Sequence, residues 1–146
     1  MKIAILTLSD RSARGERADA SAPALADWLA QRGYGVVQTE IIPDDAPTIV
    51  AKLTEWADSG RFDLILTTGG TGVAPRDVTP EATLQVLQRV VPGIGEVMRA
   101  RCLQKTPHAM LSRAVAGIRG TSLIINLPGS PKGAVECLEA VWEAVP

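Results

Sequence analysis

Apolar residues along this chain occur in two patterns, short continuous runs and runs at helical spacing. Continuous runs predict strands at residues 2–8, 34–42, 61–66, 113–118 and 122–127. Spacing of three and four residues predicts helices over 19–31, 46–59, 80 to about 92, 94–104 and 132–144. Because strands and helices alternate, we expect an α/β fold with a mostly parallel sheet, helices on both faces, and a short antiparallel edge strand or hairpin near the C-terminus.

Polar residues and glycines mark the ends of these helices. Asp45, Thr79 and Ser130 each precede a helical run that has a proline at its first or second position, which is typical of N-cap residues. Gly33 and Gly60 follow the last apolar residue of two helices, as C-terminal glycines do. The pattern therefore assigns a capping role to Asp45, Thr79 and Ser130.

Composition narrows the class of protein. The chain has 146 residues, which suits a single domain over 1–146, and its net charge is −1 without a basic run. These values argue against nucleic acid or a membrane as the main partner. Cys102 and Cys137 fit buried small residues in a reducing compartment, and the N-terminal apolar run is too short for a signal peptide, so we expect a cytoplasmic protein.

The segment Thr67–Asp77 is the most informative stretch, since a buried strand runs into a loop with glycines at 69, 70 and 72 and then into a helix. Glycines allow a close approach of backbone to ligand, so free N–H groups and the hydroxyls of Thr68 and Thr71 suit phosphate oxygens. The spacing matches neither a Walker loop nor a dinucleotide fingerprint. A tight turn of small residues is the alternative interpretation.

Four polar loops follow predicted strands, at Ser9–Asp10, Asp44–Asp45, 67–77 and 128–130. In a parallel sheet they all emerge at one edge, where open α/β proteins bind ligands. Pro128, Gly129 and Ser130 lead into the last helix, whose N-terminus offers a second anion site. Simple helix capping by Ser130 is the alternative.

Two aspartates in these loops have no capping role, because Asp45 and Thr79 are better placed as caps. Asp44 and Asp77 therefore suit Mg²⁺, which takes few protein carboxylates together with substrate phosphates. The alternative is that each makes a loop hydrogen bond or is solvated. Arg76 is a candidate phosphate contact or a solvated side chain, and His108, beside Pro107, has no nucleophile partner in a recognisable pattern.

The segment Thr67–Ala82 closely resembles the MogA/MoaB family of molybdenum-cofactor biosynthesis proteins. The resemblance covers essentially the whole chain and includes further blocks at Thr7–Asp10, Ile42–Asp45, Pro92–Met98, Leu111–Ile118 and Asn126–Lys132. It implies a three-layer α/β fold and an enzyme that adenylylates molybdopterin with Mg-ATP and releases pyrophosphate. It also implies a homo-oligomer, as a trimer or hexamer, and a molybdenum insertase as a candidate partner.

The resemblance carries the family's two essential aspartates onto Asp44 and Asp77, which would hold Mg²⁺ and act as the catalytic pair. It implies that phosphates bind at Gly69–Gly72 and at Ser130, with Ser9 and Asp10 nearby. Two other functions stay open at this point. One is a MoaB-type protein that binds molybdopterin or nucleotide without catalysis, and the other is a scaffold or regulatory oligomer.

Overall fold

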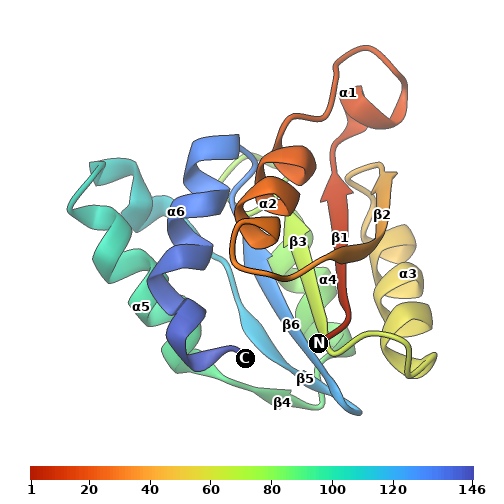
Figure 1. Ribbon diagram of the computed structural model, residues 1–146. Helices are drawn as coiled ribbons and strands as arrows, with labels where there is room; N and C mark the ends of the chain where they lie inside the picture. The colour runs from red at the N-terminus through yellow and green to blue at the C-terminus, as the bar shows by residue number, and fades with distance from the viewer.

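The computed structural model describes residues 1–146 as six strands and six α-helices with two short 3₁₀ helices (Figure 1). None of the helices is both long enough and apolar enough to cross a membrane. The strands are β1 (Ile3–Leu8), β2 (Val36–Ile42), β3 (Leu64–Thr68), β4 (Arg89–Val90), β5 (Ala116–Arg119) and β6 (Ser122–Leu127). The helices are α1 (Asp10–Ala13), α2 (Ser21–Ala30), α3 (Ala46–Asp58), α4 (Thr79–Val86), α5 (Pro92–Leu103), η1 (Pro107–Leu111), α6 (Pro131–Val141) and η2 (Trp142–Ala144).

All six strands form one sheet in the order β2-β1-β3-β6-β5-β4. β1, β2, β3 and β6 are parallel, whereas β5 pairs antiparallel with β6 and β4 antiparallel with β5. The predicted mostly parallel sheet with an antiparallel edge is therefore confirmed. The chain crosses from β2 to β3 on the other side of β1, so the strand order switches between β1 and β3.

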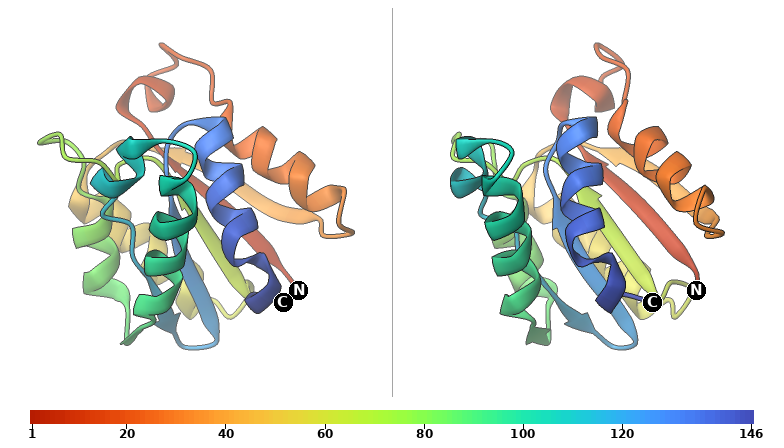
Figure 2. Two further views of the ribbon diagram at one scale, coloured as in Figure 1. Left: turned by 90° about the vertical axis from the view of Figure 1, so that its left-hand side faces the viewer. Right: turned by 60° about the vertical axis from the view of Figure 1, so that its left-hand side comes forward.

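Helices cover both faces of the sheet, which gives three layers (Figures 1 and 2). One apolar core lies under α2, α5 and α6 and includes Leu25, Met98 and Leu138. The second core lies under α3 and α4 and includes Leu53 and Val86. Central strand residues are buried on both faces, which explains why their sequences are continuous apolar runs instead of alternating ones.

A buried polar network ties the sheet to α4 close to the carboxyl ends of the strands. The side-chain amide of Asn126 donates to the hydroxyls of Thr67 and Thr83, each at 3.0 Å. Its oxygen accepts the N–H of Val115 at 3.1 Å. Because a buried amide is costly unless its hydrogen bonds are made, this network fixes how β3, β6 and α4 sit together.

Three local predictions were wrong. The helix that begins near Pro80 ends at Val86, and Arg89–Val90 then forms β4, an exposed strand that exists only by pairing with β5. The polar loop at Ser9–Asp10 is partly helical, because Asp10 begins a single helical turn, α1. Thr79 is the first residue of α4 and not its cap, because its hydroxyl donates to the carbonyl of Gly69 at 2.9 Å instead.

Candidate active site

The four polar loops expected at one edge do meet there, at the switch point between β1 and β3. The N–H of Asp44 donates to the carboxylate of Asp10 at 2.9 Å, which joins the loops after β1 and β2. The hydroxyl of Thr68 donates to the carbonyl of Pro128 at 2.7 Å, which joins the loops after β3 and β6. The topology therefore brings together the segments that the sequence singled out.

The glycine loop makes a sharp turn that side chains would prevent. Gly69 and Gly70 have φ values of +104° and +71°, in the region that glycine adopts without strain. A Cβ at Gly69 would overlap the carbonyl of Leu8, and one at Gly70 would overlap the hydroxyl of Thr79. The N–H groups of Gly70, Thr71 and Gly72 donate to no acceptor within the protein, so they are available to an anion.

Asp44 faces this loop with an unpaired oxygen. Its Oδ2 accepts the N–H of Asp10 at 3.2 Å, but its Oδ1 is buried without a hydrogen-bond partner. A Cβ built on Gly70 would lie 3.2 Å from that Oδ1. Burial raises the pKa of Asp44 above its ordinary value, and the negative charges of Asp10 and Asp77 raise it further. This oxygen can therefore bind a cation or accept a hydrogen bond.

Asp77 closes the other side of the glycine loop. Its Oδ2 accepts the N–H of Ala74 at 3.0 Å, so the carboxylate has one loop hydrogen bond. A Cβ added at Gly72 would lie 2.9 Å from the same oxygen, which shows how closely the carboxylate packs against the loop. Asp77 was expected to be free of a capping role because Thr79 would cap α4. Thr79 does not cap that helix, but neither Asp44 nor Asp77 caps a helix.

The side chains of Ser9 and Asp10 are both engaged by other groups of the protein. Ser9 is the N-cap of α1 and accepts the N–H of Ser12 at 3.2 Å. Asp10 forms an ion pair with Arg76 at 2.7 Å, and this bond lowers the pKa of the Asp10 carboxyl. Arg76 therefore contacts a carboxylate of the neighbouring loop, and the exposed pair links that loop to the turn before Asp77.

Ser130 is the N-cap of α6, as expected, and accepts the N–H of Gly133 at 3.0 Å. The preceding Gly129 is held by Ser21, whose hydroxyl donates to its carbonyl at 2.6 Å. A Cβ on Gly129 would lie 3.4 Å from the Cα of Gly69. The start of α6 and the glycine loop are therefore in direct contact, without side chains between them.

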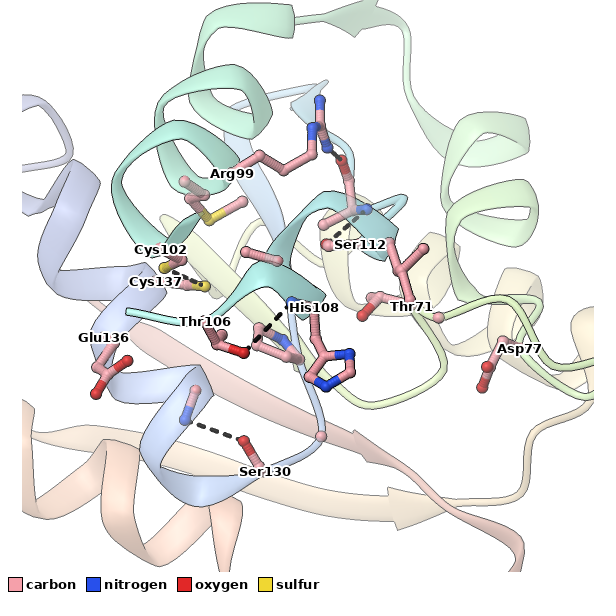
Figure 3. A pocket seen from close by; sticks show the side chains of 18 of the residues that line it. Thr71, Asp77, Arg99, Cys102, Thr106, His108, Ser112, Ser130, Glu136 and Cys137 are labelled. Carbon is pink, nitrogen blue, oxygen red and sulfur yellow. Dashed lines mark hydrogen bonds between the residues drawn. The ribbon is translucent and has the colours of Figure 1, made fainter. Parts of the chain in front are cut away.

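A cavity of about 510 Å³ lies beside the glycine loop (Figure 3). Asp77 and Thr71 stand at one end, and Glu136 with the two cysteines at the other. Its walls come from the glycine loop, α5, η1 and the start of α6. The residues lining it are Gly70, Thr71, Gly72, Val73, Asp77, Met98, Arg99, Cys102, Thr106, His108, Ala109, Leu111, Ser112, Ala114, Pro128, Gly129, Ser130, Gly133, Glu136 and Cys137.

Cys102 and Cys137 are buried and reduced, as the sequence suggested, but they are also neighbours. Their sulfur atoms lie 3.1 Å apart where α5 packs on α6. Burial raises the pKa of the Cys137 thiol far above its ordinary value, so the group stays protonated at neutral pH. The pair forms part of the cavity wall.

A second, polar cavity of about 260 Å³ lies on the other side of the loop. Its polar lining includes Ser9, Ser12, Arg17, Asp19, Ser21 and Thr68. Both cavities are bounded by Gly70 and Gly129. Two ligands, one in each cavity, would therefore meet across glycines.

Sequence reasoning missed the far wall of the larger cavity. Thr106, His108 and Ser112 come from η1 and its ends, and Arg99 and Glu136 come from α5 and α6. These residues belong to no recognisable motif. They lie together only because α5, η1 and α6 pack against one another. The one available signal was His108 beside Pro107, in a break between two predicted elements.

The chain also matches known proteins over its whole length. Residues 4–146 match a family model described as "Probable molybdopterin binding domain". A molybdopterin adenylyltransferase of Helicobacter pylori is 47% identical over 99% of this chain and 83% of its own length. One from Escherichia coli K12 is 46% identical over 99% of this chain and 75% of its own length.

The solved structures agree with these matches. The crystal structure of the molybdopterin biosynthesis enzyme MoaB from Thermus thermophilus is 54% identical, with a TM-score of 0.93 over 99% of this chain and 91% of that one. Since the family model and full-length relatives well above 30% identity agree, the chain belongs to the MogA/MoaB family of molybdenum-cofactor biosynthesis proteins.

Proposed function

We propose that this chain is a molybdopterin adenylyltransferase of molybdenum cofactor biosynthesis. The observation that carries the proposal is its similarity to full-length relatives of that name, at 46–47% identity. The site is consistent with a reaction of two substrates, since two cavities share a wall of glycines. ATP and molybdopterin are the substrates, and the products are adenylyl-molybdopterin and pyrophosphate.

In this reaction a phosphate oxygen of molybdopterin attacks the α-phosphorus of ATP. A new P–O bond forms as the bond to the leaving pyrophosphate breaks, so phosphate groups of both substrates must come together. The shared boundary at Gly70 and Gly129 allows this approach because no side chain stands there. The free N–H groups of Gly70–Gly72 are placed to hold phosphate oxygens and to stabilise charge that develops on them.

We further propose that Asp44 and Asp77 hold Mg²⁺. The buried, unpaired Oδ1 of Asp44 is an oxygen ligand without a partner, and the Asp77 carboxylate borders the same loop. Two carboxylates suffice for Mg²⁺, because that ion takes one or two carboxylates and completes its shell with phosphates and water. Bound there, Mg²⁺ would neutralise charge between two anionic substrates.

A second candidate is a MoaB-type protein that binds molybdopterin or nucleotide without turnover. The observation that favours it is the identity of 54% to a MoaB structure, which exceeds the identity to the adenylyltransferases. Both candidates predict binding, so only catalysis separates them.

The test is pyrophosphate release by purified protein given Mg-ATP and molybdopterin, with Asp77→Asn alongside. The proposal requires turnover by wild type, and binding without turnover by the variant. If wild type binds molybdopterin but releases no pyrophosphate, the MoaB-type function is correct and the catalytic roles of Asp44 and Asp77 are wrong.

We also propose a homo-oligomer, a trimer or hexamer, that works in the cytoplasm and passes its product to a molybdenum insertase. Large apolar side chains on the surface support the assembly, among them Val37 and Ile41 on the edge strand β2. Light scattering of the purified protein tests the oligomer, and a monomer in solution would contradict it.

A further inference from the structure

Arg113 binds the glycine loop at three backbone positions, although it lines neither of the two cavities. Its own N–H donates to the carbonyl of Thr71 at 2.9 Å. Its guanidinium donates from Nε to the carbonyl of Gly72 at 2.7 Å and from Nη2 to the carbonyl of Asp77 at 2.6 Å. One side chain therefore joins both ends of the turn formed by residues 73–76.

That turn has few other attachments. Residues 73–76 are exposed, with Val73 at 66% of its full exposure. Within the turn, the N–H of Asp77 donates to the carbonyl of Ala74 at 2.9 Å, and the N–H of Ala74 donates to the Asp77 carboxylate. The ion pair from Arg76 to Asp10 is on the surface, where such pairs contribute little. The position of Asp77 therefore depends on the backbone bonds that Arg113 makes.

The charge of Arg113 is neutralised away from the site. Its Nη1 pairs with the carboxylate of Glu81 in the first turn of α4. The guanidinium makes no hydrogen bond to the carboxylate of Asp77 and binds only the carbonyl of that residue. Arg113 thus holds Asp77 in place and leaves its carboxylate free of a competing cation.

We propose that Arg113 is the positioning residue for Asp77, and that adenylyl transfer depends on its three guanidinium bonds. The inference rests on the proposed function, because it assigns Asp77 to the reacting phosphates or their metal. Only arginine has a planar fork with several fixed donors, whereas lysine offers one flexible ammonium group. Arg113→Lys keeps the charge but cannot reach three acceptors on separate segments.

Arg119 offers a matched control for this substitution. Its Nε and Nη2 bind the carboxylate of Asp58, and its Nη1 binds the carbonyl of Val86 at 3.0 Å. Arg119 lies in β5 and Arg113 in the segment before it, and each binds one carboxylate and at least one backbone carbonyl. Both side chains are part-buried, and neither arginine lines a cavity. Arg119→Lys should therefore measure what the loss of such a fork does to stability alone.

We expect Arg113→Lys to lower kcat by about 100-fold, the size of effect that a displacement of about 1 Å produces, while KM for ATP changes by less than about threefold. Hydrogen–deuterium exchange of residues 72–78 should become faster in this variant and stay unchanged in Arg119→Lys. The two variants should have similar melting temperatures. Arg113→Gln, with a neutral amide, repeats the comparison if the lysine variant folds poorly.

The inference is overturned if Arg113→Lys matches Arg119→Lys in kcat, or if exchange of residues 72–78 does not change. A rise in KM of about 100-fold with unchanged kcat would also overturn the inference, because that result means weaker substrate binding. If wild type releases no pyrophosphate, the proposed function fails on its own. The exchange comparison then decides separately whether Arg113 holds the Asp77 turn.

Discussion

Replacing Asp44 by asparagine should stabilise the protein while it removes activity. Asparagine keeps an oxygen for the N–H of Asp10 and replaces the buried, unpaired Oδ1 with a neutral group. An unsatisfied buried polar atom costs about 1–3 kcal/mol, and more when it is charged. Asparagine places an amide NH2 where Oδ1 stands, so its gain comes from removing the buried charge and the repulsion from Asp10 and Asp77. We take about 1 kcal/mol, at the low end of that range, because Asp44 is only half-buried and its other oxygen is bonded. For a chain of this size the gain corresponds to a rise in Tm of about 2–4 °C.

The stability gain should depend on pH in a defined direction. The folded protein raises the pKa of Asp44 through burial and through the charges of Asp10 and Asp77, so folding favours the protonated form. The ionised carboxylate therefore lowers stability once the pH exceeds that raised pKa, and protonation restores it. The advantage of asparagine should be full near neutral pH and should disappear as the pH falls below about 3.9, the ordinary aspartate value.

The assay is differential scanning calorimetry in EDTA, so that bound metal does not add stability, with Asp45→Asn as the control. Asp45 is the neighbouring residue and caps α3 by accepting the N–H of Thr48 at 3.1 Å. Asparagine caps helices about as well as aspartate, so Asp45→Asn should change stability by less than about 0.5 kcal/mol. If Asp44→Asn has the Tm of wild type or a lower one, or if its gain does not vary with pH, the reasoning from the unpaired oxygen is wrong.

Three further predictions concern the loop, the cysteines and an ion pair. Gly70→Ala should lower the free energy of unfolding by about 1–3 kcal/mol in urea titration, because alanine at φ +71° is strained and its Cβ overlaps the Thr79 hydroxyl. Unchanged stability would contradict the loop geometry. Cys137 should react with iodoacetamide at least tenfold more slowly in the folded protein than in urea, since burial keeps its thiol protonated; mass spectrometry measures this, and equal rates would contradict it. The bond from Arg119 holds the pKa of Asp58 below its usual value, so the stability it gives is present above about pH 3.9 and lost in acid; Asp58→Asn should destabilise at neutral pH only.

The parts of the fold that the sequence predicted correctly depend on local signals. Asp45 and Ser130 cap helices that begin directly after them, so their neighbours in sequence determine their contacts. Gly33 and Gly60 adopt positive φ at two helix ends for the same reason. The meeting of four loops at one edge follows from the parallel arrangement of β1, β2, β3 and β6, which the alternation of strands and helices predicted.

The errors occurred where a contact distant in sequence decides the structure. Thr79 has the sequence of an N-cap, but the glycine loop folds back and places the carbonyl of Gly69 within reach of its hydroxyl. Arg89 and Val90 are both exposed and show no strand pattern, so only the register with β5 makes them a strand. Arg113 is another case, since its four hydrogen bonds go to residues 71–81, more than 30 positions earlier.

The two aspartates that the sequence singled out are prepared for their proposed role in opposite ways. Asp44 lies in the loop after β2, where one of its oxygens is buried without a partner and its pKa is raised. Asp77 lies on an exposed turn, where its carboxylate is fixed through backbone bonds from Arg113. Removing the charge of Asp44 should therefore raise the stability of the protein. Removing the Arg113 bond to the Asp77 backbone should lower activity without a matching loss of stability. If both aspartates were prepared in the same way, the two variants would change stability and activity alike. Comparing Asp44→Asn with Arg113→Lys therefore distinguishes the effect of burial from that of positioning.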